Sequence, residues 1–465
     1  MIFIYIRNIH FHYVKILHLP TCFIWLCNHS FWAKKNCKPN FVVIFTDDQT
    51  FRAIGYNNSE VLTPNLDNLA KKGLIFNKAF TSTPVCAASR ASVFTGLYPQ
   101  TNGTVALDRN SFIKNIVNEN KFNTMAEFLQ DEGYTTYFSG KSHLGNPQDY
   151  GFRFGYESNS FNDEIAFKEM SNFIEKEDFG EQPFFIWLAP RQPHVPLKPA
   201  QQWLELYPFE NISIEKNFLN TPEQESVFNQ GLPGEHFYRD SDYTNNYKNL
   251  PAGPPRSTEV ITEFTKAYYA TITHLDFQIG YFINQLKESG HMENTVFIFL
   301  SDNGYLLGNH GLGNKLTMHE ESVRIPMFIY WDQLKIDVHE SEALVSSTDV
   351  LPTILNIAGL PIPEYLHGKS VLPILKDPSV SINDFIASES VGVGGKVGTG
   401  HRMIRSPEWK YIITDINDEL LFNLSDDPYE LNNLIDNDAY ESILVKLKGY
   451  YQEWRDLVGD EKLIP

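Results

Sequence analysis

Residues 41–48 read FVVIFTDD, an apolar run that ends in a threonine and two aspartates. An unbroken run of this length is typical of a strand buried on both faces of a parallel sheet. Similar apolar runs recur along the chain, at residues 74–80, 134–140, 183–189 and 295–301. Helical patterns separate several of them, as in TPNLDNLAKKG (63–73) and FNTMAEFLQDEG (122–133). The alternation predicts an α/β fold with a large, doubly wound, mostly parallel sheet flanked by helices.

The first of these helices carries its own start and stop signals. Thr63 is expected to cap it, Pro64 to occupy its first turn, and Gly73 to end it. A longer amphipathic helix is expected from about residue 259 to residue 290, after a polar, proline-rich region at 190–256.

The chain divides into three segments by composition and pattern. Residues 1–38 form a separate N-terminal stretch, and residues 39–375 carry the strand–helix alternation. Residues 376–465 contain short strand-like runs at 402–414 and 419–424, and a charged helix is expected from about residue 437 to residue 458. Short strands separated by turn residues are typical of antiparallel sheets. We therefore expect a smaller C-terminal α+β subdomain with a short antiparallel sheet.

The N-terminal stretch has the features of an export signal. Arg7 and Lys15 precede an apolar run at residues 16–27, which is too short to span a bilayer but suits the core of a signal peptide. We expect residues 1–38 to direct the protein to the periplasm or out of the cell, without a stable membrane span. A misassigned start site is the alternative explanation.

Charge balance and cysteine usage exclude several classes of protein. The 38 Lys and Arg against 57 Asp and Glu give a net charge of −19, which argues against nucleic acids and anionic membranes as partners. Three of the 4 cysteines lie within the first 37 residues, so a disulfide scaffold is excluded. Cys86 is either a small buried hydrophobic residue or a reactive centre. At the start of a predicted helix, its thiol is expected to be acidified by backbone N–H groups.

Acidic side chains follow two of the predicted strands. Asp47 and Asp48 close the first apolar run, and Asp302 and Asn303 follow the last one. Ligands of α/β sheets bind beyond the carboxyl ends of the strands, so we expect these four side chains to lie together. Three carboxylates and an amide oxygen form a cage of hard ligands suited to Ca²⁺ or Mg²⁺.

A second set of candidate site residues is basic. It comprises Arg90, Lys141, His143, His194 and Lys315. Arg90 lies one helical turn after Cys86, so both side chains face the same side of the helix. The other four lie in loops, two of them directly after the run at 134–140. A cation cage beside Lys, His and Arg donors predicts a site for a tetrahedral dianionic group such as sulfate or phosphate.

The segment CAASRASVFTG (86–96) resembles the signature of the type I sulfatases, which belong to the alkaline-phosphatase-like superfamily. That signature has a cysteine, then Pro or Ala two positions later and Arg four positions later, and Cys86, Ala88 and Arg90 match it. Six further motifs of the family occur in order over about residues 40–435: TDDQ, TPNLDNLAKKG, GKSH, PHVP, SDNG and LSDDPYELNNL. Residues 39–375 would then be the sulfatase catalytic domain.

The resemblance implies a modified nucleophile and a metal. A maturation enzyme would oxidise Cys86 to formylglycine, whose hydrated aldehyde offers an oxygen nucleophile to the sulfur atom. Because Ala88 replaces the commoner proline, which maturation system acts is left open. The ligands of a single Ca²⁺ ion, with Mg²⁺ less favoured, would be Asp47, Asp48, Cys86, Asp302 and Asn303.

The resemblance also implies roles for the basic residues. Arg90, together with the ion, would lower the pKa of the attacking hydroxyl. Lys141, Lys315 and His194 would bind sulfate oxygens, with His194 and Lys315 nearest the leaving oxygen so that they can protonate it. His143 would take the proton of the remaining hydroxyl and so release sulfate.

Sulfated carbohydrates are the expected substrates, with ulvan-type polysaccharides and glycosaminoglycans both open. Aromatic residues of the 190–256 region could stack on sugar rings or simply pack that region; they are Trp203, Tyr207, Phe237, Tyr238, Tyr243 and Tyr247. The alternatives are a phosphomonoester or phosphonate hydrolase, a sulfamidase (to which residues 55–86 are locally similar), or a non-catalytic protein that binds sulfated glycans. The last would be expected to lack the nucleophile or a metal carboxylate, and the sequence keeps both.

Overall fold

The structure, a computed structural model, describes most of the chain beyond its N-terminal stretch. The described residues are 38–105, 107, 109–158, 163–177, 179–180, 182–220, 257–391 and 400–460. The expected export segment therefore lies outside them, except for its last residue, and so do residues 221–256 of the proline-rich region. Within the described ranges, no helix has the length and apolar character needed to cross a membrane.

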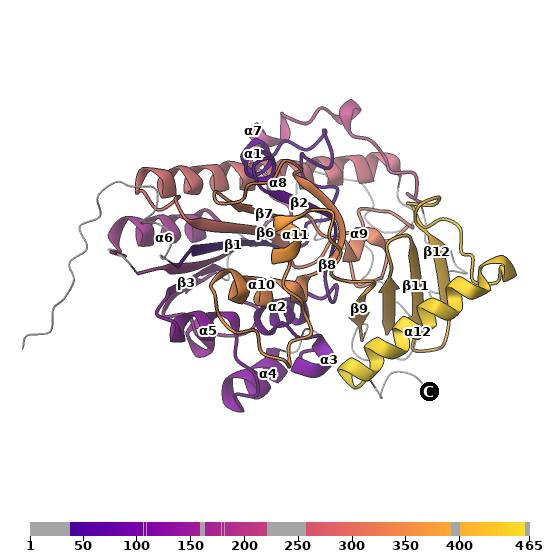
Figure 1. The fold of residues 1–465 in the computed structure, drawn as a ribbon. Coiled ribbons are helices and arrows are strands. Elements are labelled where there is room, and N and C mark those ends of the chain that lie inside the picture. The colour runs from indigo at the N-terminus through magenta and orange to yellow at the C-terminus, as the bar shows by residue number, and fades with distance from the viewer. Residues whose placement is uncertain are drawn as a thin grey trace, which may run out of the picture. The chain divides into compact units, whose positions relative to one another are not determined.

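A large mixed sheet forms the centre of the main body (Figure 1). From one edge to the other, its strands in the described residues are β4 (Phe154–Glu157), β3 (Thr135–Gly140), β5 (Phe184–Ala189), β1 (Asn40–Thr46), β6 (Thr295–Ser301), β7 (Met327–Trp331), β2 (Leu74–Phe80) and β8 (Glu340–Ser346). β7 runs antiparallel to both of its neighbours, and the other neighbouring pairs are parallel. The mostly parallel sheet predicted from the apolar runs is confirmed.

Helices cover both faces of this sheet (Figure 1). One face is covered by α1 (Pro64–Ala70), α6 (Asp163–Lys176) and α8 (Thr258–Glu288). The other is covered by α2 (Cys86–Thr95), α5 (Met125–Asp131), α10 (Val350–Ile357) and α11 (Leu372–Lys376). Val42 and Ile44 of β1 point to the first face, and Phe41, Val43 and Phe45 point to the second. Since successive side chains of a strand alternate between faces, a strand covered on both sides must be apolar throughout.

Short helices connect these elements. They are α3 (Pro99–Asn102), α4 (Arg109–Phe112), α7 (Gln201–Leu204) and α9 (Glu320–Val323). The expected long helix is α8, which begins at Thr258 and ends at Glu288, within two residues of its predicted bounds.

The register of the central strands brings several strand ends to one edge. Thr46 at the end of β1 pairs with Ser301 at the end of β6, and Gly140 at the end of β3 pairs with Ala189 at the end of β5. β5 in turn lies between β3 and β1. The residues that follow these four strands therefore emerge side by side, at the edge where α/β sheets bind ligands.

A second sheet follows in the C-terminal part of the chain. Its strands, in spatial order, are β12 (Glu419–Asn423), β11 (Trp409–Thr414), β10 (His401–Arg405) and β9 (Ile386–Ser390), all antiparallel. α12 (Glu441–Val458) lies across this sheet and buries Tyr451 and Trp454 against it (Figure 1). The predicted α+β architecture of this part is confirmed. The helix begins later than residue 437, because Asn437 first caps a short turn over Asp438–Tyr440.

The signals at the two ends of α1 act differently from what the sequence suggests. Thr63 is the N-cap residue of the helix, but its hydroxyl accepts a hydrogen bond from Gly55 N at 2.7 Å and donates one to Asp67 Oδ1 at 2.9 Å, so it binds no backbone N–H of the helix itself. The helix ends at Ala70, before Gly73. A Cβ at Gly73 would lie 2.2 Å from the carbonyl oxygen of Ile329, so close packing against β7 is the physical reason for this glycine. The helix and the positions of Thr63 and Pro64 at its start are confirmed, whereas the expectation that Gly73 ends it was wrong.

Candidate active site

The four predicted oxygen ligands lie together at the carboxyl edge of the sheet. Asp47 and Asp48 directly follow β1, and Asp302 and Asn303 directly follow β6. Asp48 N donates to Asp302 Oδ1 at 3.0 Å, and Asn303 Nδ2 donates to Asp48 Oδ1 at 2.8 Å. All four residues are buried. The parallel pairing of β1 and β6 thus joins residues that are about 255 positions apart in the chain.

Several oxygens of this cluster are available to a cation. Among the described residues, Asp47 Oδ1, Asp48 Oδ2 and Asn303 Oδ1 are buried and have no hydrogen-bond partner. Buried acceptors of this kind are costly unless something satisfies them. Ligand atoms of Asp47, Asp48, Cys86 and His194 also lie within 4.8 Å of one another. The donor set, dominated by carboxylate oxygens, fits a hard divalent cation such as Ca²⁺.

Asp302 takes part in the cluster differently from the other carboxylates. Both of its oxygens accept hydrogen bonds, Oδ1 from Asp48 N and Oδ2 from the Arg90 guanidinium. Burial and the charge of Asp47 together raise the pKa of Asp302 to about 7, against the opposing charges of Arg90 and Lys315. In contrast, Lys141, His194, Arg90 and Lys315 together outweigh burial and hold the pKa of Asp47 well below its usual range.

Asp48 has an unusual backbone, and a distant tyrosine holds it in place. The φ angle of Asp48 is 65°, in the left-handed region that non-glycine residues rarely adopt. Tyr268, on α8, donates a hydrogen bond from its hydroxyl to Asp48 O and accepts one from Thr50 N. Sequence reasoning missed Tyr268, because no local motif marks a residue that acts 220 positions away from its partner.

Cys86 begins α2 and faces the oxygen cluster. It is buried, with its Sγ 2.6 Å from Lys315 Nζ and 3.8 Å from Asp48 Oδ1. The pKa of the thiol is raised to about 12, chiefly by burial; Lys141 and Lys315 offset only part of the shift, and Asp302 and Asp48 add to it. The expectation that the helix start acidifies this thiol was therefore wrong. An unmodified thiol stays protonated here at neutral pH, and a protonated thiol is a weak nucleophile.

Arg90 lies one turn after Cys86 on the buried side of α2. Its Nε and one terminal nitrogen donate to Asp302 Oδ2 at 3.1 and 2.8 Å. Its other terminal nitrogen donates to the carbonyl oxygen of Lys141 at 2.9 Å. The guanidinium thereby ties α2 to the ends of β6 and β3, and it lies 3.6 Å from Asp47 Oδ1.

Two lysines supply positive charge to the same cluster. Lys141 Nζ lies 2.5 Å from Asp47 Oδ2, and Lys315 Nζ pairs with Asp48 Oδ1. Although burial alone would lower the pKa of Lys315, the charges around it, first that of Asp48, raise this pKa well above its usual value. Lys315 is therefore protonated at neutral pH.

The two predicted histidines differ in their surroundings. His194 Nδ1 lies 2.5 Å from the carbonyl oxygen of Val195, and since a carbonyl only accepts, Nδ1 is the donor. Its Nε2 lies 3.7 Å from Asp48 Oδ2, inside the cluster, and burial lowers the pKa of the ring. For His143, burial lowers the pKa to about 3, and the positive charges of Lys141 and Arg90 contribute. His143 is therefore neutral at neutral pH.

Two of the aromatic residues of the 190–256 region lie in the described part of the chain, and their surroundings differ. Tyr207 is buried, and its hydroxyl bonds to Leu62 N and Thr273 Oγ1, so it packs the fold and cannot stack on a sugar. Trp203 is half-buried and stacks on His274 at a centroid distance of 5.2 Å. The other four aromatic residues, Phe237, Tyr238, Tyr243 and Tyr247, lie outside the described residues.

The family model of the sulfatases matches residues 39–360, well over half of the chain. This protein belongs to the sulfatase family. A second model, for the C-terminal part of N-sulphoglucosamine sulphohydrolase, matches residues 308–456. The sulfatase is accordingly a hydrolase, and the resemblance carried by the segment around Cys86 is confirmed.

Related proteins match this sulfatase over nearly its whole length. It is 27% identical to an arylsulfatase of Clostridium perfringens, over 90% of this chain and 96% of the relative. It is 26% identical to an ulvan-active sulfatase of Formosa agariphila, over 91% of this chain and 82% of the relative. A solved structure of a protein in complex with its substrate, D-glucosamine-2-N,6-O-disulfate, superimposes with a TM-score of 0.79 at 24% identity, covering 92% of this chain and 99% of the other. The structural likeness confirms the fold.

Proposed function

We propose that this sulfatase hydrolyses sulfate esters of carbohydrates, with residue 86 as the nucleophile after oxidation of Cys86 to formylglycine. The observation that supports this most directly is the place of Cys86, buried at the start of α2 between Lys315 and Asp48. The aldehyde of formylglycine, once hydrated, supplies an oxygen nucleophile. An unmodified thiol with a pKa of about 12 is protonated at neutral pH and is therefore a weak nucleophile. A maturation enzyme that carries out this oxidation is a required partner.

We also propose that one Ca²⁺ ion completes the site. Asp47, Asp48, Asp302 and Asn303 would hold it, together with oxidised residue 86. The ion would supply Lewis-acid stabilisation of negative charge on the nucleophile and on sulfate. The unpartnered buried oxygens of Asp47, Asp48 and Asn303 support this assignment.

The basic side chains would bind sulfate and transfer protons. Lys141 and Lys315 bind sulfate oxygens, and protonated Lys315 carries a proton that the leaving oxygen can take. An incoming anionic sulfate favours the protonated form of His194, whose Nε2 then donates towards the same leaving oxygen. Neutral His143 has a ring nitrogen, Nδ1, that is buried without a hydrogen bond to any described residue and can accept a proton from residue 86.

Sulfated sugars are proposed as substrates because of what similar proteins act on. The relative from Formosa agariphila is named as ulvan-active, and the superimposed structure holds a glucosamine bearing an N-sulfate and an O-sulfate. The C-terminal match to N-sulphoglucosamine sulphohydrolase favours sulfamate hydrolysis as a second candidate function. Release of sulfate from glucosamine 6-O-sulfate, but not from glucosamine 2-N-sulfate, would decide for ester hydrolysis.

Export to the periplasm or the medium is part of the same proposal. The basic residues and the apolar run of residues 1–38 support it. Fractionation of the producing cells, followed by N-terminal sequencing of the active protein, tests export directly.

The central test follows residue 86 itself. Peptide mass spectrometry should show the peptide containing residue 86 about 18 Da lighter than its cysteine form, the difference between a thiol and an aldehyde at that carbon. Cys86→Ala should abolish sulfate release while leaving the melting temperature nearly unchanged, since little buried volume is removed. A Cys86→Ser variant that is shown to be unoxidised and yet retains full activity would refute the formylglycine assignment.

A further inference from the structure

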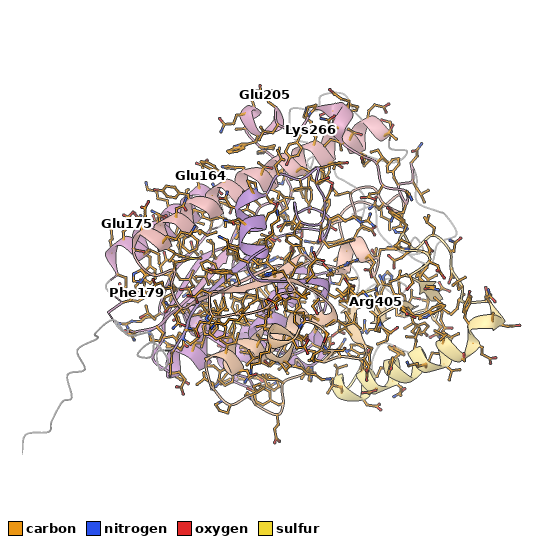
Figure 2. All side chains as sticks on the ribbon, turned by 45° about the horizontal axis from the view of Figure 1, so that its top comes forward. Glu164, Glu175, Phe179, Glu205, Lys266 and Arg405 are labelled. Atoms are coloured by element: carbon orange, nitrogen blue, oxygen red, sulfur yellow. The ribbon has the colours of Figure 1, made fainter. Side chains whose placement is uncertain are left out.

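The loop that carries His194 is held by a buried carboxylate outside the predicted site. Asp163, the first residue of α6, is only 1% exposed. Its Oδ1 accepts a hydrogen bond from Arg191 N at 2.9 Å, and its Oδ2 accepts one from Gln192 N at 2.8 Å. Glu164, labelled in Figure 2, marks this end of α6. Two consecutive backbone N–H groups of the loop after β5 are thus bound to the start of one helix.

The same short loop is bound on its other side to the metal-site strand. Gln192 O accepts a hydrogen bond from Asp47 N at 3.4 Å, and Arg191 O accepts one from His194 N at 2.7 Å. The loop therefore has three fixed points within four residues: α6, the end of β1 and its own closing turn. These contacts hold the loop so that His194 lies beside the cluster, with its Nε2 3.7 Å from Asp48 Oδ2.

Only a carboxylate of this length fits the position of Asp163. Two adjacent N–H donors need two acceptor oxygens, and an amide offers one oxygen together with an NH₂ group that would face a donor. A buried donor left without an acceptor shifts or loosens the loop. A displacement of about 1 Å in a group that acts on the substrate is enough to lower the rate about a hundredfold.

We infer that Asp163 is a positioning residue for catalysis: through Arg191 and Gln192 it fixes the loop so that Nε2 of His194 faces the leaving oxygen of the sulfate ester. The inference rests on the proposed role of His194. It adds a residue that lies 31 positions before His194 and that no motif of the site includes.

A second buried aspartate binds the backbone in the same way as Asp163 and provides a matched control. Asp276 on α8 is 2% exposed and also binds two consecutive backbone N–H groups, those of Asn65 at 3.2 Å and Leu66 at 2.8 Å. Burial raises the pKa of both carboxyls to about 6. Asp276, however, holds the start of α1 and not the loop of His194. Asp276→Asn should therefore reproduce the structural cost of Asp163→Asn without its effect on the leaving group.

The experiment compares leaving groups in the full-length, matured enzyme. In Asp163→Asn, kcat/KM for glucosamine 6-O-sulfate, a poor leaving group, should fall about 10- to 100-fold. For 4-nitrophenyl sulfate, whose phenolate needs little protonation, it should fall about threefold or less. His194→Ala should show the same split between the two substrates, and adding Asp163→Asn to it should cause little further loss. Asp276→Asn should lower the melting temperature similarly and show no split.

Two outcomes separate this inference from the proposed function. Equal losses for both substrates in Asp163→Asn, with a split in His194→Ala, would overturn the positioning role and leave the role of His194 intact. No split in His194→Ala would overturn the role of His194 itself. If Asp163→Asn yields no folded protein, Asp163→Glu serves instead: it keeps both acceptor oxygens but moves the loop by one methylene, and the same split is expected from it.

Discussion

Asp47 and Asp48 are neighbours in the chain, and each pairs one carboxylate oxygen with a different lysine. Lys141 binds Asp47 Oδ2, and Lys315 binds Asp48 Oδ1. The second oxygen of each residue, Asp47 Oδ1 and Asp48 Oδ2, has no hydrogen-bond partner in the described part of the chain. Each aspartate therefore has one oxygen whose charge is balanced and one oxygen available to a metal ion. Without the lysines, two adjacent buried carboxylates would repel each other and raise each other's pKa.

This arrangement predicts that Ca²⁺ binds to the folded enzyme and stabilises it. After exhaustive dialysis against EDTA, added Ca²⁺ should raise the melting temperature by several degrees, because a ligand at a hundredfold excess over its Kd stabilises by about 2.7 kcal/mol. Differential scanning fluorimetry measures this shift. In Asp48→Asn the shift should be much smaller, since one ligand charge is lost.

The control for the calcium experiment is Asp332→Asn, which removes one exposed carboxylate beside the start of β6, at the opposite end of that strand from Asp302 and Asn303. It should keep the full shift. An equal shift in Asp48→Asn and in the unchanged enzyme would remove Asp48 from the set of ligands.

At the scale of elements, the C-terminal sheet holds the segment that follows the Lys315 loop. Glu320, the first residue of α9, lies 2.8 Å from Lys410 Nζ of β11 and 3.4 Å from Arg405 Nε of β10. Glu430 lies 2.7 Å from the same lysine nitrogen and accepts a hydrogen bond from Glu320 N. Arg405 is labelled in Figure 2, and Lys410 is fully buried. The second sheet thus fixes one end of a loop that reaches the candidate site.

Glu320 predicts a pH dependence of stability. Burial alone would raise the pKa of this carboxyl, but Lys410, Arg405 and Arg324 outweigh burial and lower it. A lowered pKa means that the charged form stabilises the fold: the contribution is fully present above the unfolded-state pKa of about 4.3 and is lost as the pH falls from there through the folded-state pKa of about 2. In Glu320→Gln, the melting temperature should be lower at pH 7, and its decrease from pH 7 to pH 2 should be smaller than in the unchanged enzyme.

Glu453→Gln, an exposed change on α12, is the matched variant for this measurement. It should follow the unchanged enzyme at both pH values. If Glu320→Gln also loses stability in parallel with the unchanged enzyme on acidification, the ion pairs around Glu320 are not the source of the pH dependence.

Features that depend on residues close together in the sequence could be predicted, and features that depend on residues far apart in the sequence could not. An apolar run and the acidic residues that follow it are adjacent in the sequence. The strands β1, β3, β5 and β6, and the acids that follow β1 and β6, could therefore be predicted. The acidified thiol of Cys86 was not confirmed, because the degree of burial that raises its pKa depends on the whole fold. Tyr268 and Asp163 act on backbone atoms far along the chain, and no spacing rule identifies such contacts.

At the scale of the molecule, side chains from the two sheets pack together in one buried cluster. One apolar cluster combines residues of the larger sheet and its loops with residues of the smaller sheet: Phe80, Met318, Val323 and Leu344 with Ile386, Met403, Ile412, Leu420 and Phe422. The ion pairs of Glu320 cross the same boundary. The boundary proposed after residue 375 therefore divides a common core, although it separates two differently patterned segments of the sequence.

We accordingly predict that residues 39–375 do not fold when they are produced without residues 376–465. The fragment would expose Phe80, Val323 and Leu344 and leave Glu320 without its lysine and one of its arginines. Leaving a buried Phe, Val or Leu side chain exposed costs about 1.5–3 kcal/mol each, and together these costs are a large part of the 5–15 kcal/mol that stabilises an ordinary domain. The fragment should be insoluble, or soluble with strong binding of the dye ANS and no near-UV circular dichroism, whereas residues 39–465 should be folded. Production of residues 376–465 in the same cells should recover soluble protein. A fragment 39–375 that unfolds cooperatively and has a native near-UV spectrum would instead make the two segments independent domains.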